Sequence, residues 1–328
     1  MILKKNTKKK ILVTGGSGFI GTNVINNFID KNYEVVNIDT APPKIPNHVK
    51  YWRNVDIRDY KTLLTEVQNF LPDYILHLAA RTDLNGKNID EYNSNTLGTQ
   101  NIVNICNEIK TVKRVLFASS MLVNSVGSSP LSLSDYSPDT SYGESKVEME
   151  RVIITSKLKA EWAIIRPTSI WGPWFGEPYS NFFYFVIKGM FVHPGNRACT
   201  KTYGYIDNSV FQISTLLLTA KKTLIEGKIF YIGDKPPINI SDWADEISMQ
   251  NNGTRNKKVY FWVFKVAALI GDLLKLANVK FPMTSFRLKN MTTDHILPLD
   301  DLYSVVGDNF FTRIQGTKKT LQWIKNKK

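Results

Sequence analysis

The sequence predicts an α/β protein built on a doubly wound parallel sheet. From residue 11 onward, short β-branched runs alternate with longer amphipathic stretches. The short runs are apolar along their whole length, which is typical of strands buried on both faces between layers of helices. A glycine-rich turn follows the first run directly, as in sheets that bind ligands at their carboxyl edge. Right-handed crossovers through the helices make such strands parallel.

The expected elements follow in order along the chain. Residues 11–14 form an apolar strand that ends in glycines, and apolar residues recur at helical spacing in 22–30. A second strand follows at 34–38. Residues 60–70 are amphipathic, and a Pro-Asp pair ends this helix before the strand at 74–78. The remaining helices and strands alternate at 90–110, 112–118, 141–157, 163–165, 209–220 and 229–232.

The chain length of 328 residues suits about two domains. The first is expected to cover 10–170 and about 203–235. The second, smaller and of mixed structure, is expected to cover about 171–202 and 236–328. Residues 171–200 are rich in Trp, Phe, Pro and Gly, which favours an irregular, aromatic-lined segment over a cleft.

Lysines at the two ends account for most of the net charge of +13. Five lie within the first ten residues and five within the last eleven, so the body between them carries about +3. Solvated tails and no nucleic-acid partner are therefore expected. The alternative is a weak peripheral contact of the tails with an anionic membrane surface. A composition of 43% apolar and 22% charged residues excludes a disordered chain.

The two cysteines, Cys106 and Cys199, are too few for a disulfide framework and have no metal-ligand spacing. We therefore expect no metal site and a reducing, cytoplasmic setting.

The longest apolar stretch covers 259–277, and Lys265, Asp272 and Lys275 interrupt it. These charges disfavour a membrane-spanning helix. We expect a helix packed on the body, with interfacial membrane attachment as the alternative. The basic N-terminus is not followed by the apolar region of a signal peptide.

The glycine-rich segment joins the first expected strand to the first helix. Its early glycines allow a tight turn and a close approach to a pyrophosphate, and the last lets helix and strand pack together. The helix N-terminus adds N–H groups and positive partial charge. The sequence therefore predicts a dinucleotide site formed by Gly15, Gly16, Ser17, Gly18, Phe19, Ile20 and Gly21.

Asp39 closes the second expected strand, where a carboxylate can bind the diol of an adenosine ribose. A carboxylate there repels a 2′-phosphate, so NAD is favoured over NADP. Asp56 and Ile57 are expected near the adenine edge, with helix capping as the alternative role for Asp56.

Tyr142 and Lys146 lie four residues apart and therefore share one face of a helix. A nearby cation lowers the pKa of a tyrosine. An acid/base group tuned in this way suits hydride chemistry at a carbinol, because the hydroxyl proton must leave as hydride departs. Ser119 and Ser120 end the strand at 112–118, where a hydroxyl can hydrogen-bond the reacting oxygen.

Together these segments resemble the extended short-chain dehydrogenase/reductases of the nucleotide-sugar epimerase/dehydratase family. The resemblance covers about residues 11–235 and implies a Rossmann domain for NAD, a smaller C-terminal substrate-binding domain and a homodimer. The matching segments are 14–21, Asp39, 56–57, 77–80, Asn95 with 98–99, 119–120, Tyr142 with Lys146, 166–167 and 205–208.

The resemblance also implies roles for single residues. Ser120, Tyr142 and Lys146 would be catalytic, and Tyr142 and Lys146 would also contact the cofactor. Further cofactor contacts are implied at Leu78, Ala79, Ala80, Asn95, Ser119 and Pro167. Substrate contacts are implied at Thr82, Ser120, Asn181, Lys201 and Arg287.

Four residues depart from the family pattern. Dehydratases of the family carry Asp-Glu directly after the catalytic hydroxyl, whereas this chain has Met121 and Leu122, which cannot transfer protons. Dehydration is therefore not expected. Asn124 stands in place of the usual tyrosine, and Lys201 replaces a diphosphate-binding arginine, which keeps the charge but loses the bidentate fork.

The leading hypothesis is an NAD-dependent epimerase that acts on a nucleotide-sugar, at C4 of a UDP-hexose or UDP-N-acetylhexosamine, through a transient keto-sugar. The first alternative is a reductase of a keto-sugar or of a steroid-like alcohol. An aromatic run keeps the steroid option open, although core packing also explains it: Trp171, Trp174, Phe175, Phe182, Phe183, Tyr184 and Phe185. The second alternative is a non-catalytic NAD-binding member of the fold.

Overall fold

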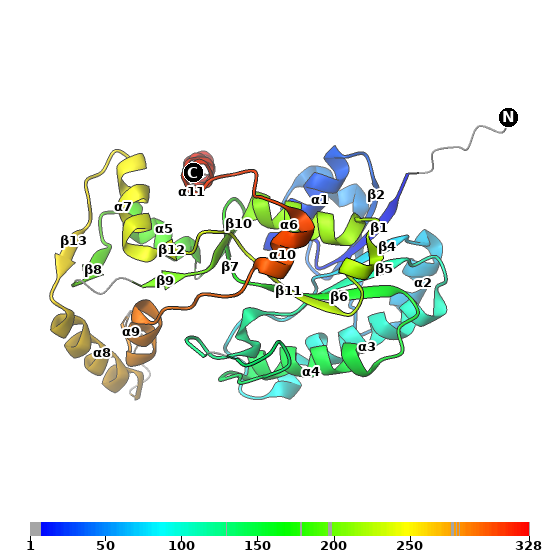
Figure 1. The fold of residues 1–328 in the computed structure, drawn as a ribbon, viewed down its shortest axis with the longest axis horizontal. Helices are drawn as coiled ribbons and strands as arrows, with labels where there is room; N and C mark the ends of the chain where they lie inside the picture. Colours follow the sequence, from blue (N-terminus) through cyan, green and yellow to red (C-terminus); the bar gives the residue numbers. More distant parts are fainter. Residues whose placement is uncertain are drawn as a thin grey trace.

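A seven-stranded parallel sheet forms one half of the protein, as the sequence predicts (Figure 1). This computed structural model describes residues 8–327 except 129, 178, 196–198, 277, 278, 280 and 282. The strands lie in the order β11, β6, β5, β4, β1, β2, β3. Their bounds are β1 Lys10–Thr14, β2 Glu34–Asp39, β3 Trp52–Asn54, β4 Tyr74–His77, β5 Arg114–Ala118, β6 Glu161–Pro167 and β11 Lys228–Ile232.

The strand order reverses between β1 and β4, because the chain first adds β2 and β3 on one side and then β4, β5 and β6 on the other. At this point the loops that follow the two neighbouring strands run in opposite directions. A crevice therefore opens at the carboxyl ends of these strands. The sheet topology therefore predicts where a ligand binds.

Helices cover both faces of the sheet (Figure 1). Successive residues of β1 show the two layers: Ile11 and Val13 belong to one core cluster and Leu12 to the other. α1 and α6 pack together in the first layer, and α2, α3 and α4 form the second. The helix bounds are α1 Phe19–Asp30, α2 Tyr60–Phe70, α3 Asn93–Glu108, α4 Ser141–Thr155 and α6 Ile206–Leu218.

The second half of the protein is built from short strand pairs and small helices. Three two-stranded sheets join β10 to β7, β12 to β9 and β13 to β8. The elements are β7 Ser169–Trp171, α5 Tyr179–Ile187, β8 Val192–Pro194, β9 Thr200–Lys201, β10 Tyr203–Tyr205, β12 Ile238–Asn239, α7 Ile240–Gln250, β13 Lys257–Val259, α8 Phe261–Leu276, α9 Ser285–Thr292, α10 Asp300–Val306 and α11 Arg313–Asn326. Short 3-10 turns lie at η1 Pro46–Tyr51, η2 Ile89–Tyr92, η3 Met121–Val123 and η4 Lys222–Leu224. The division into two domains stays a prediction.

Most expected elements lie where the apolar periodicity places them, with their ends shifted by a few residues. The helix expected at 90–110 begins instead as the 3-10 turn η2, and α3 follows it. The expectation of an irregular segment at 171–200 is wrong, because this segment holds α5 and the strands β8 and β9. Of the lysine-rich tails, residues 1–7 and Lys328 lie outside the described part of the chain.

Much of the aromatic run after β6 is core rather than a lining of the ligand crevice, although Phe185 is 44% exposed. The Trp171 ring lies 4.8 Å from Trp243 and 5.8 Å from Phe183, measured between ring centroids. All three side chains are buried. This packing removes the support that the aromatic run gave to a hydrophobic substrate.

A buried ion pair ties β6 to α4. Arg166 donates to both carboxylate oxygens of Glu150, at 2.8 and 2.7 Å, and both side chains are fully buried. The guanidinium also donates to the Tyr231 hydroxyl and to the Leu133 carbonyl. Because Glu150 lies one helical turn after Lys146, this pair fixes the helix that carries Tyr142 and Lys146.

The apolar stretch at 259–277 contains the helix α8. Its inner side, with Phe264 and Ala268, packs on Leu288 of α9. The helix is therefore packed on the body through this inner side, as expected. Its opposite side is exposed, which was not expected. No helix in the described part of the chain is long and apolar enough to cross a bilayer.

Candidate active site

A cleft of about 980 Å³ opens at the carboxyl ends of the strands beside the point where their order reverses. The loops after β1, β2, β4, β5 and β6 all contribute to its wall. Most of the residues expected to bind cofactor line it: Gly15, Ser17, Gly18, Phe19, Ile20, Gly21, Asp39, Asp56, Ile57, Leu78, Ala79, Ala80, Ser119, Tyr142, Lys146 and Pro167. Gly16 and Asn95 lie outside the lining.

The glycine loop leaves no room for side chains at two of its positions. A Cβ atom at Gly15, which has φ +74°, would lie 2.6 Å from the Ala79 backbone nitrogen. A Cβ atom at Gly21 would lie 2.2 Å from the Gly15 carbonyl oxygen. α1 begins directly after this loop, and no side chain caps its N-terminus. The backbone therefore forms a shallow cradle with unpaired helix N–H groups, a geometry that suits a pyrophosphate.

Asp39 lies against the glycine loop at the end of β2. Its Oδ2 accepts a hydrogen bond from the Ser17 backbone N–H at 3.0 Å, and its Oδ1 accepts one from Ala41 at 2.9 Å. Lys44 lines the same end of the cleft, and burial and Lys327 lower its pKa against an opposing effect of Asp39. The carboxylate is thus oriented by two backbone groups toward the region that a ribose would occupy.

Asp56 does not cap a helix. Both of its carboxylate oxygens accept hydrogen bonds from the Arg58 guanidinium, and this pairing lowers the pKa of Asp56. The residue that caps α2 is Asp59, which accepts a hydrogen bond from the Thr62 backbone N–H. The capping alternative for Asp56 is therefore wrong, and its place in the cleft wall remains.

A chain of buried hydrogen bonds runs beneath the cleft through His77. Thr99 donates its hydroxyl proton to the Asn95 carbonyl at 2.7 Å, so Thr99 must accept from Nε2–H of His77, 3.1 Å away. Nδ1 of His77 then accepts from the Thr14 hydroxyl at 2.7 Å, and Thr14 accepts from the Ala79 backbone N–H. This neutral tautomer joins β1, β4 and α3. Burial, and to a smaller extent Lys146, lowers the pKa of His77 to about 3.

The free energy of unfolding should fall in mild acid because of His77. Below about pH 6.5 the unfolded chain binds a proton at this histidine and the folded chain does not, so roughly 1.4 kcal/mol is lost for each pH unit. We expect a loss of about 2 kcal/mol between about pH 6.5 and 5, measured by urea denaturation. In His77→Gln, whose side chain does not titrate, the free energy of unfolding should fall by about 2 kcal/mol less over the same pH range. Equal pH slopes in the two proteins would contradict this role.

Ser120, Tyr142 and Lys146 converge at the end of the cleft that β5 and α4 form. All three side chains are more than nine-tenths buried and line the cleft. Ser120 caps η3, and its Oγ accepts a hydrogen bond from the Leu122 backbone N–H at 3.1 Å. The Lys146 ammonium donates to the Ala118 carbonyl at 2.8 Å. These three residues therefore lie together in the cleft, and their catalytic roles stay predictions.

The expectation that Lys146 lowers the pKa of Tyr142 is wrong for this structure. Burial raises the pKa of Tyr142 to about 12, against a hydrogen bond from Ser120 that lowers it. Burial also lowers the pKa of Lys146 to about 7, against an opposing effect of Glu150. The enclosed site therefore disfavours both charged forms, and a phenolate needs a further positive charge in the cleft.

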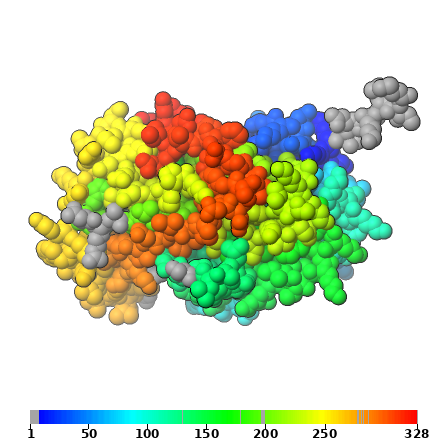
Figure 2. Space-filling model, in the orientation of Figure 1, coloured from blue at the N-terminus to red at the C-terminus, as the bar shows by residue number. Residues whose placement is uncertain are grey.

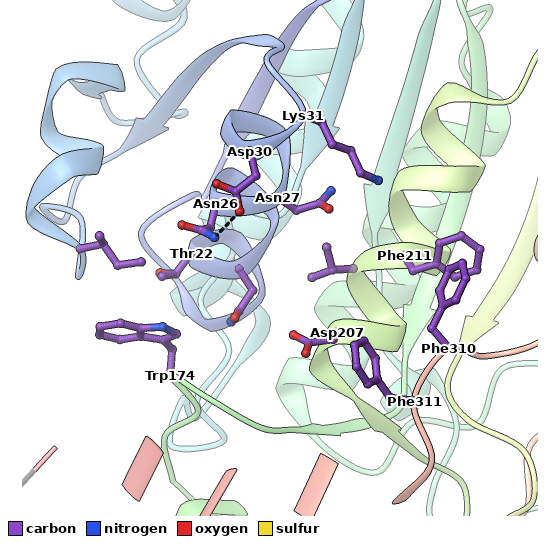
Figure 3. A pocket seen from close by; sticks show the side chains of 13 residues that line it. Thr22, Asn26, Asn27, Asp30, Lys31, Trp174, Asp207, Phe211, Phe310 and Phe311 are labelled. Carbon is purple, nitrogen blue, oxygen red and sulfur yellow. Dashed lines mark hydrogen bonds between the residues drawn. The ribbon is translucent and has the colours of Figure 1, made fainter. Parts of the chain in front are cut away.

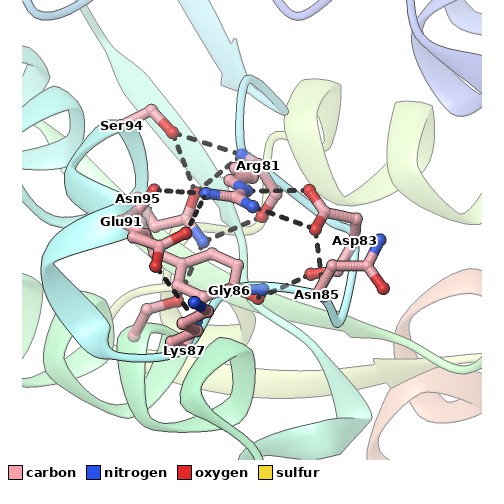
Figure 4. A network of polar contacts seen from close by, with 10 residues as sticks. Arg81, Asp83, Asn85, Gly86, Lys87, Glu91, Ser94 and Asn95 are labelled. Atoms are coloured by element: carbon pink, nitrogen blue, oxygen red, sulfur yellow. Dashed lines mark hydrogen bonds and ion pairs between the residues drawn. The ribbon is translucent and has the colours of Figure 1, made fainter. Parts of the chain in front are cut away.

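A polar network around Arg81 forms the rim of the cleft (Figure 4). The guanidinium pairs with Asp83 and Glu91, and the Arg81 backbone N–H donates to Asn95 Oδ1 at 2.8 Å. The Asn95 amide donates in turn to the Arg81 carbonyl and to Ser145 Oγ on α4. Asn95 is fully buried, and it holds the loop after β4 instead of lining the cleft.

The expected substrate residues fall into two groups. Thr82 and Ser120 line the cleft. Asn181 lies on α5, Lys201 on β9 and Arg287 on α9, outside the lining. The Lys201 ammonium donates to the Asn290 carbonyl of α9 at 2.6 Å, so it already has a partner. Roles for these three in binding substrate stay predictions.

A second cavity, of about 450 Å³, lies between α1, α6 and residues 310–311 (Figure 3). Its polar wall comes from α1, where Asn26 donates to the Asp30 carboxylate, and its apolar wall includes Phe211 and Phe310. It contains none of the serine, tyrosine and lysine groups expected for catalysis. The larger cleft is therefore the candidate active site.

Comparison with known proteins agrees with this fold and site. Residues 11–233 match the NAD dependent epimerase/dehydratase family, and the chain belongs to that family of enzymes. NAD as the cofactor, expected from Asp39 and the glycine loop, agrees with the family. The predictions of the family and of the fold class are confirmed.

Relatives within the family carry out different reactions. The chain is 28% identical over 253 residues to a 3 beta-hydroxysteroid dehydrogenase/Delta 5-->4-isomerase of Mycobacterium tuberculosis, with 72% of this chain and 67% of that protein covered. It is 26% identical over 284 residues to a UDP-glucose 4-epimerase of Vibrio cholerae, with 83% and 84% covered.

A solved structure of a UDP-glucose 4-epimerase from Thermotoga maritima matches with a TM-score of 0.76 at 19% identity, covering 97% of this chain and 99% of that one. At this identity the likeness concerns the fold.

Proposed function

We propose that this protein is an NAD-dependent epimerase that inverts C4 of a nucleotide-sugar, a UDP-hexose or UDP-N-acetylhexosamine. The observation that carries the proposal is the convergence of Ser120, Tyr142 and Lys146 in an enclosed cleft beside the glycine loop. Epimerases of this kind are among its relatives, as the UDP-glucose 4-epimerase of Vibrio cholerae shows.

The cleft fits NAD on two grounds. The glycine loop has no room for a Cβ atom at Gly15 or Gly21, so the backbone can approach a pyrophosphate. Ser119, which lines the cleft, has a buried hydroxyl without a partner among the described residues. NAD⁺ supplies a hydride acceptor at the reacting carbon and a positive charge that favours the Tyr142 phenolate.

The residues of the chain then divide the proton chemistry between them. Tyr142 takes the proton of the C4 hydroxyl as the C4–H bond breaks and its electron pair leaves as hydride, so C4 becomes a ketone. Ser120 hydrogen-bonds the oxygen in both states. After the keto-sugar turns over, hydride returns to the other face of C4 and Tyr142 returns the proton. No net oxidation results.

The acid pair that would transfer protons in the elimination of water is missing after Ser120. Met121 and Leu122 line the cleft directly after Ser120, where family dehydratases carry an acid pair. Neither side chain can donate or accept a proton. Epimerisation or simple redox chemistry is therefore favoured over dehydration.

A reductase of a keto-sugar or of a steroid-like alcohol is the second candidate. The dehydrogenase among the relatives favours it, since 72% of this chain matches that protein. The burial of Trp171 and Phe183 in the core weakens the steroid option, because these rings are not available to a ligand. A reductase would consume NADH in every cycle.

The test is to incubate the enzyme with UDP-hexoses and UDP-N-acetylhexosamines without added NADH and to separate the products. An epimerase should form a C4 epimer with no net change in NADH absorbance. A strict requirement for stoichiometric NADH would favour the reductase. Ligands released from the denatured protein, identified by mass spectrometry, show independently whether NAD is retained during purification.

Cofactor preference should depend on Asp39. Asp39→Ala should reduce the ratio of NADP to NAD dissociation constants by about tenfold, because the repulsion of a 2′-phosphate disappears. Asp39→Asn is the matched control for charge, since it keeps an acceptor for Ser17 or Ala41. Asp39→Asn should also lower the ratio of the NADP to the NAD dissociation constant, and it should bind NAD more tightly than Asp39→Ala does. Equal affinities for the two cofactors in the unmutated protein would contradict the assignment.

The proposal also includes a homodimer, on the ground of the family resemblance, and a cytoplasmic location, on the ground of the low cysteine content. Light scattering during size-exclusion chromatography measures the oligomeric state directly. A monomer across the working concentration range would contradict the dimer.

A further inference from the structure

We propose that α8 and the strand β13 before it form a docking surface for an anionic membrane, with α8 lying in the plane of the lipid headgroups. The inference does not depend on which substrate the enzyme converts.

The outer side of α8 is an unpartnered apolar stripe. Trp262, Val266, Leu269, Ile270, Leu273 and Leu276 recur at the spacing of one helix face, with exposed fractions of 46 to 84%. Tyr260, just before the helix, is 78% exposed and extends the stripe. Large apolar patches on a soluble protein mark sites of interaction.

The inner side of α8 fixes this orientation. Phe264 and Ala268 are buried against Leu288 of α9. Gly271 lies so close to the segment before α9 that an added Cβ would be 1.7 Å from the Met283 carbonyl oxygen. The helix cannot rotate its stripe inward without breaking these contacts.

Basic residues are frequent in the segment that contains the stripe. The segment 255–289 contains eight Lys or Arg residues and one acid, Asp272, so it carries +7 whereas the body as a whole carries about +3. Those in the described part of the segment are exposed: Arg255, Lys257, Lys258, Lys265, Lys275, Arg287 and Lys289. An apolar face with Trp and Leu beside Lys and Arg is the composition of helices that lie in a lipid interface.

The charge argues for lipid over a second copy of the chain. Two such surfaces facing each other would bring like charges together, whereas anionic headgroups attract them. A helix of 16 residues is also too short to cross a bilayer, so it would lie along the interface. Figure 1 shows α8 at the end of the molecule away from β1, β2 and β3, and Figure 2 shows the same orientation as a space-filling view.

The test measures cosedimentation of the full chain with vesicles. Phosphatidylcholine vesicles containing phosphatidylserine should bind the protein, and pure phosphatidylcholine vesicles should bind it weakly. Leu269→Ser combined with Leu273→Ser should weaken binding at least about tenfold, because apolar area is lost from the interface. Lys257→Glu combined with Lys258→Glu should remove the preference for phosphatidylserine.

Two controls separate α8 from other sources of binding. Leu131→Ser combined with Ile314→Ser removes exposed apolar side chains elsewhere and should leave binding unchanged. Deletion of residues 1–7 removes two lysines, Lys4 and Lys5, so it reports how much the N-terminal tail contributes to binding. Denaturation curves verify that each variant is folded.

The proposal would be overturned by full binding of the variant that combines Leu269→Ser with Leu273→Ser. Loss of binding on deletion of residues 1–7 alone, or no binding by the unmutated chain, would also overturn it. A dimer in solution that the same leucine variant dissociates, without any lipid binding, would assign the stripe to a second copy and also overturn it.

Discussion

Tyr142→Phe should lower kcat at least about 100-fold, the low end for loss of a general acid–base group. The substitution removes the phenol oxygen and keeps the ring, which packs 6.0 Å from the Tyr92 ring between centroids. NAD binding should therefore survive. A titration with NAD that follows the quenching of the protein's tryptophan fluorescence measures this binding. The lost rate belongs to proton transfer, since C4 cannot become a ketone while its hydroxyl keeps its proton.

Tyr136→Phe is a matched control for this result. Tyr136 is a partly buried tyrosine on the neighbouring loop, and its hydroxyl donates to Glu150 away from the cleft lining. It should change stability more than turnover. Near-full activity of Tyr142→Phe on the true substrate would contradict the proton-transfer role.

Arg166→Met should destabilise the protein by about 3–5 kcal/mol, because it leaves the Glu150 carboxylate buried without its partner. Arg166→Lys should also destabilise, since an ammonium cannot reproduce the bidentate fork that holds both carboxylate oxygens. Urea denaturation at neutral pH measures both effects.

The double variant Arg166→Met with Glu150→Leu separates charge burial from lost packing. It removes the unpaired carboxylate, so it should be more stable than Arg166→Met alone. A double variant that is less stable than the single one would show that the cost lies in packing and in the lost contacts to Tyr231 and Leu133.

The sheet and the glycine loop are predictable from sequence because both depend on local patterns. Most strands of the sheet are short, largely apolar runs, although β3 (Trp52–Asn54) is not, and Gly15 to Gly21 needs only the turn between a strand and a helix. The pairing of Tyr142 with Lys146 also follows from helical spacing. These features need no knowledge of what lies across the fold.

Features that depend on distant residues were missed. The sequence marks Arg166 but not its partner Glu150, because their pairing depends on how α4 packs on β6. Asn95 was expected at the cofactor, and its side chain instead ties Arg81 to Ser145. The pKa of Tyr142 was expected to fall because of Lys146, whereas burial, which spacing cannot reveal, raises it.

The relay through His77 and the exposed stripe of α8 show the same limit. A histidine at the end of a strand indicates nothing of Thr14 and Thr99 on either side of its ring. The apolar residues of α8 read as core in the sequence, and only the packing on α9 reveals which of them remain outside.

The most direct test of the proposed epimerisation follows the hydrogen at C4. The substrate identified among the UDP-sugars is prepared with deuterium at C4 and converted without added NADH. If hydride leaves C4 and returns to the same carbon, the C4 epimer should retain deuterium, as mass spectrometry and proton NMR measure. Loss of the deuterium to solvent, or no conversion until NADH is supplied, would contradict the account.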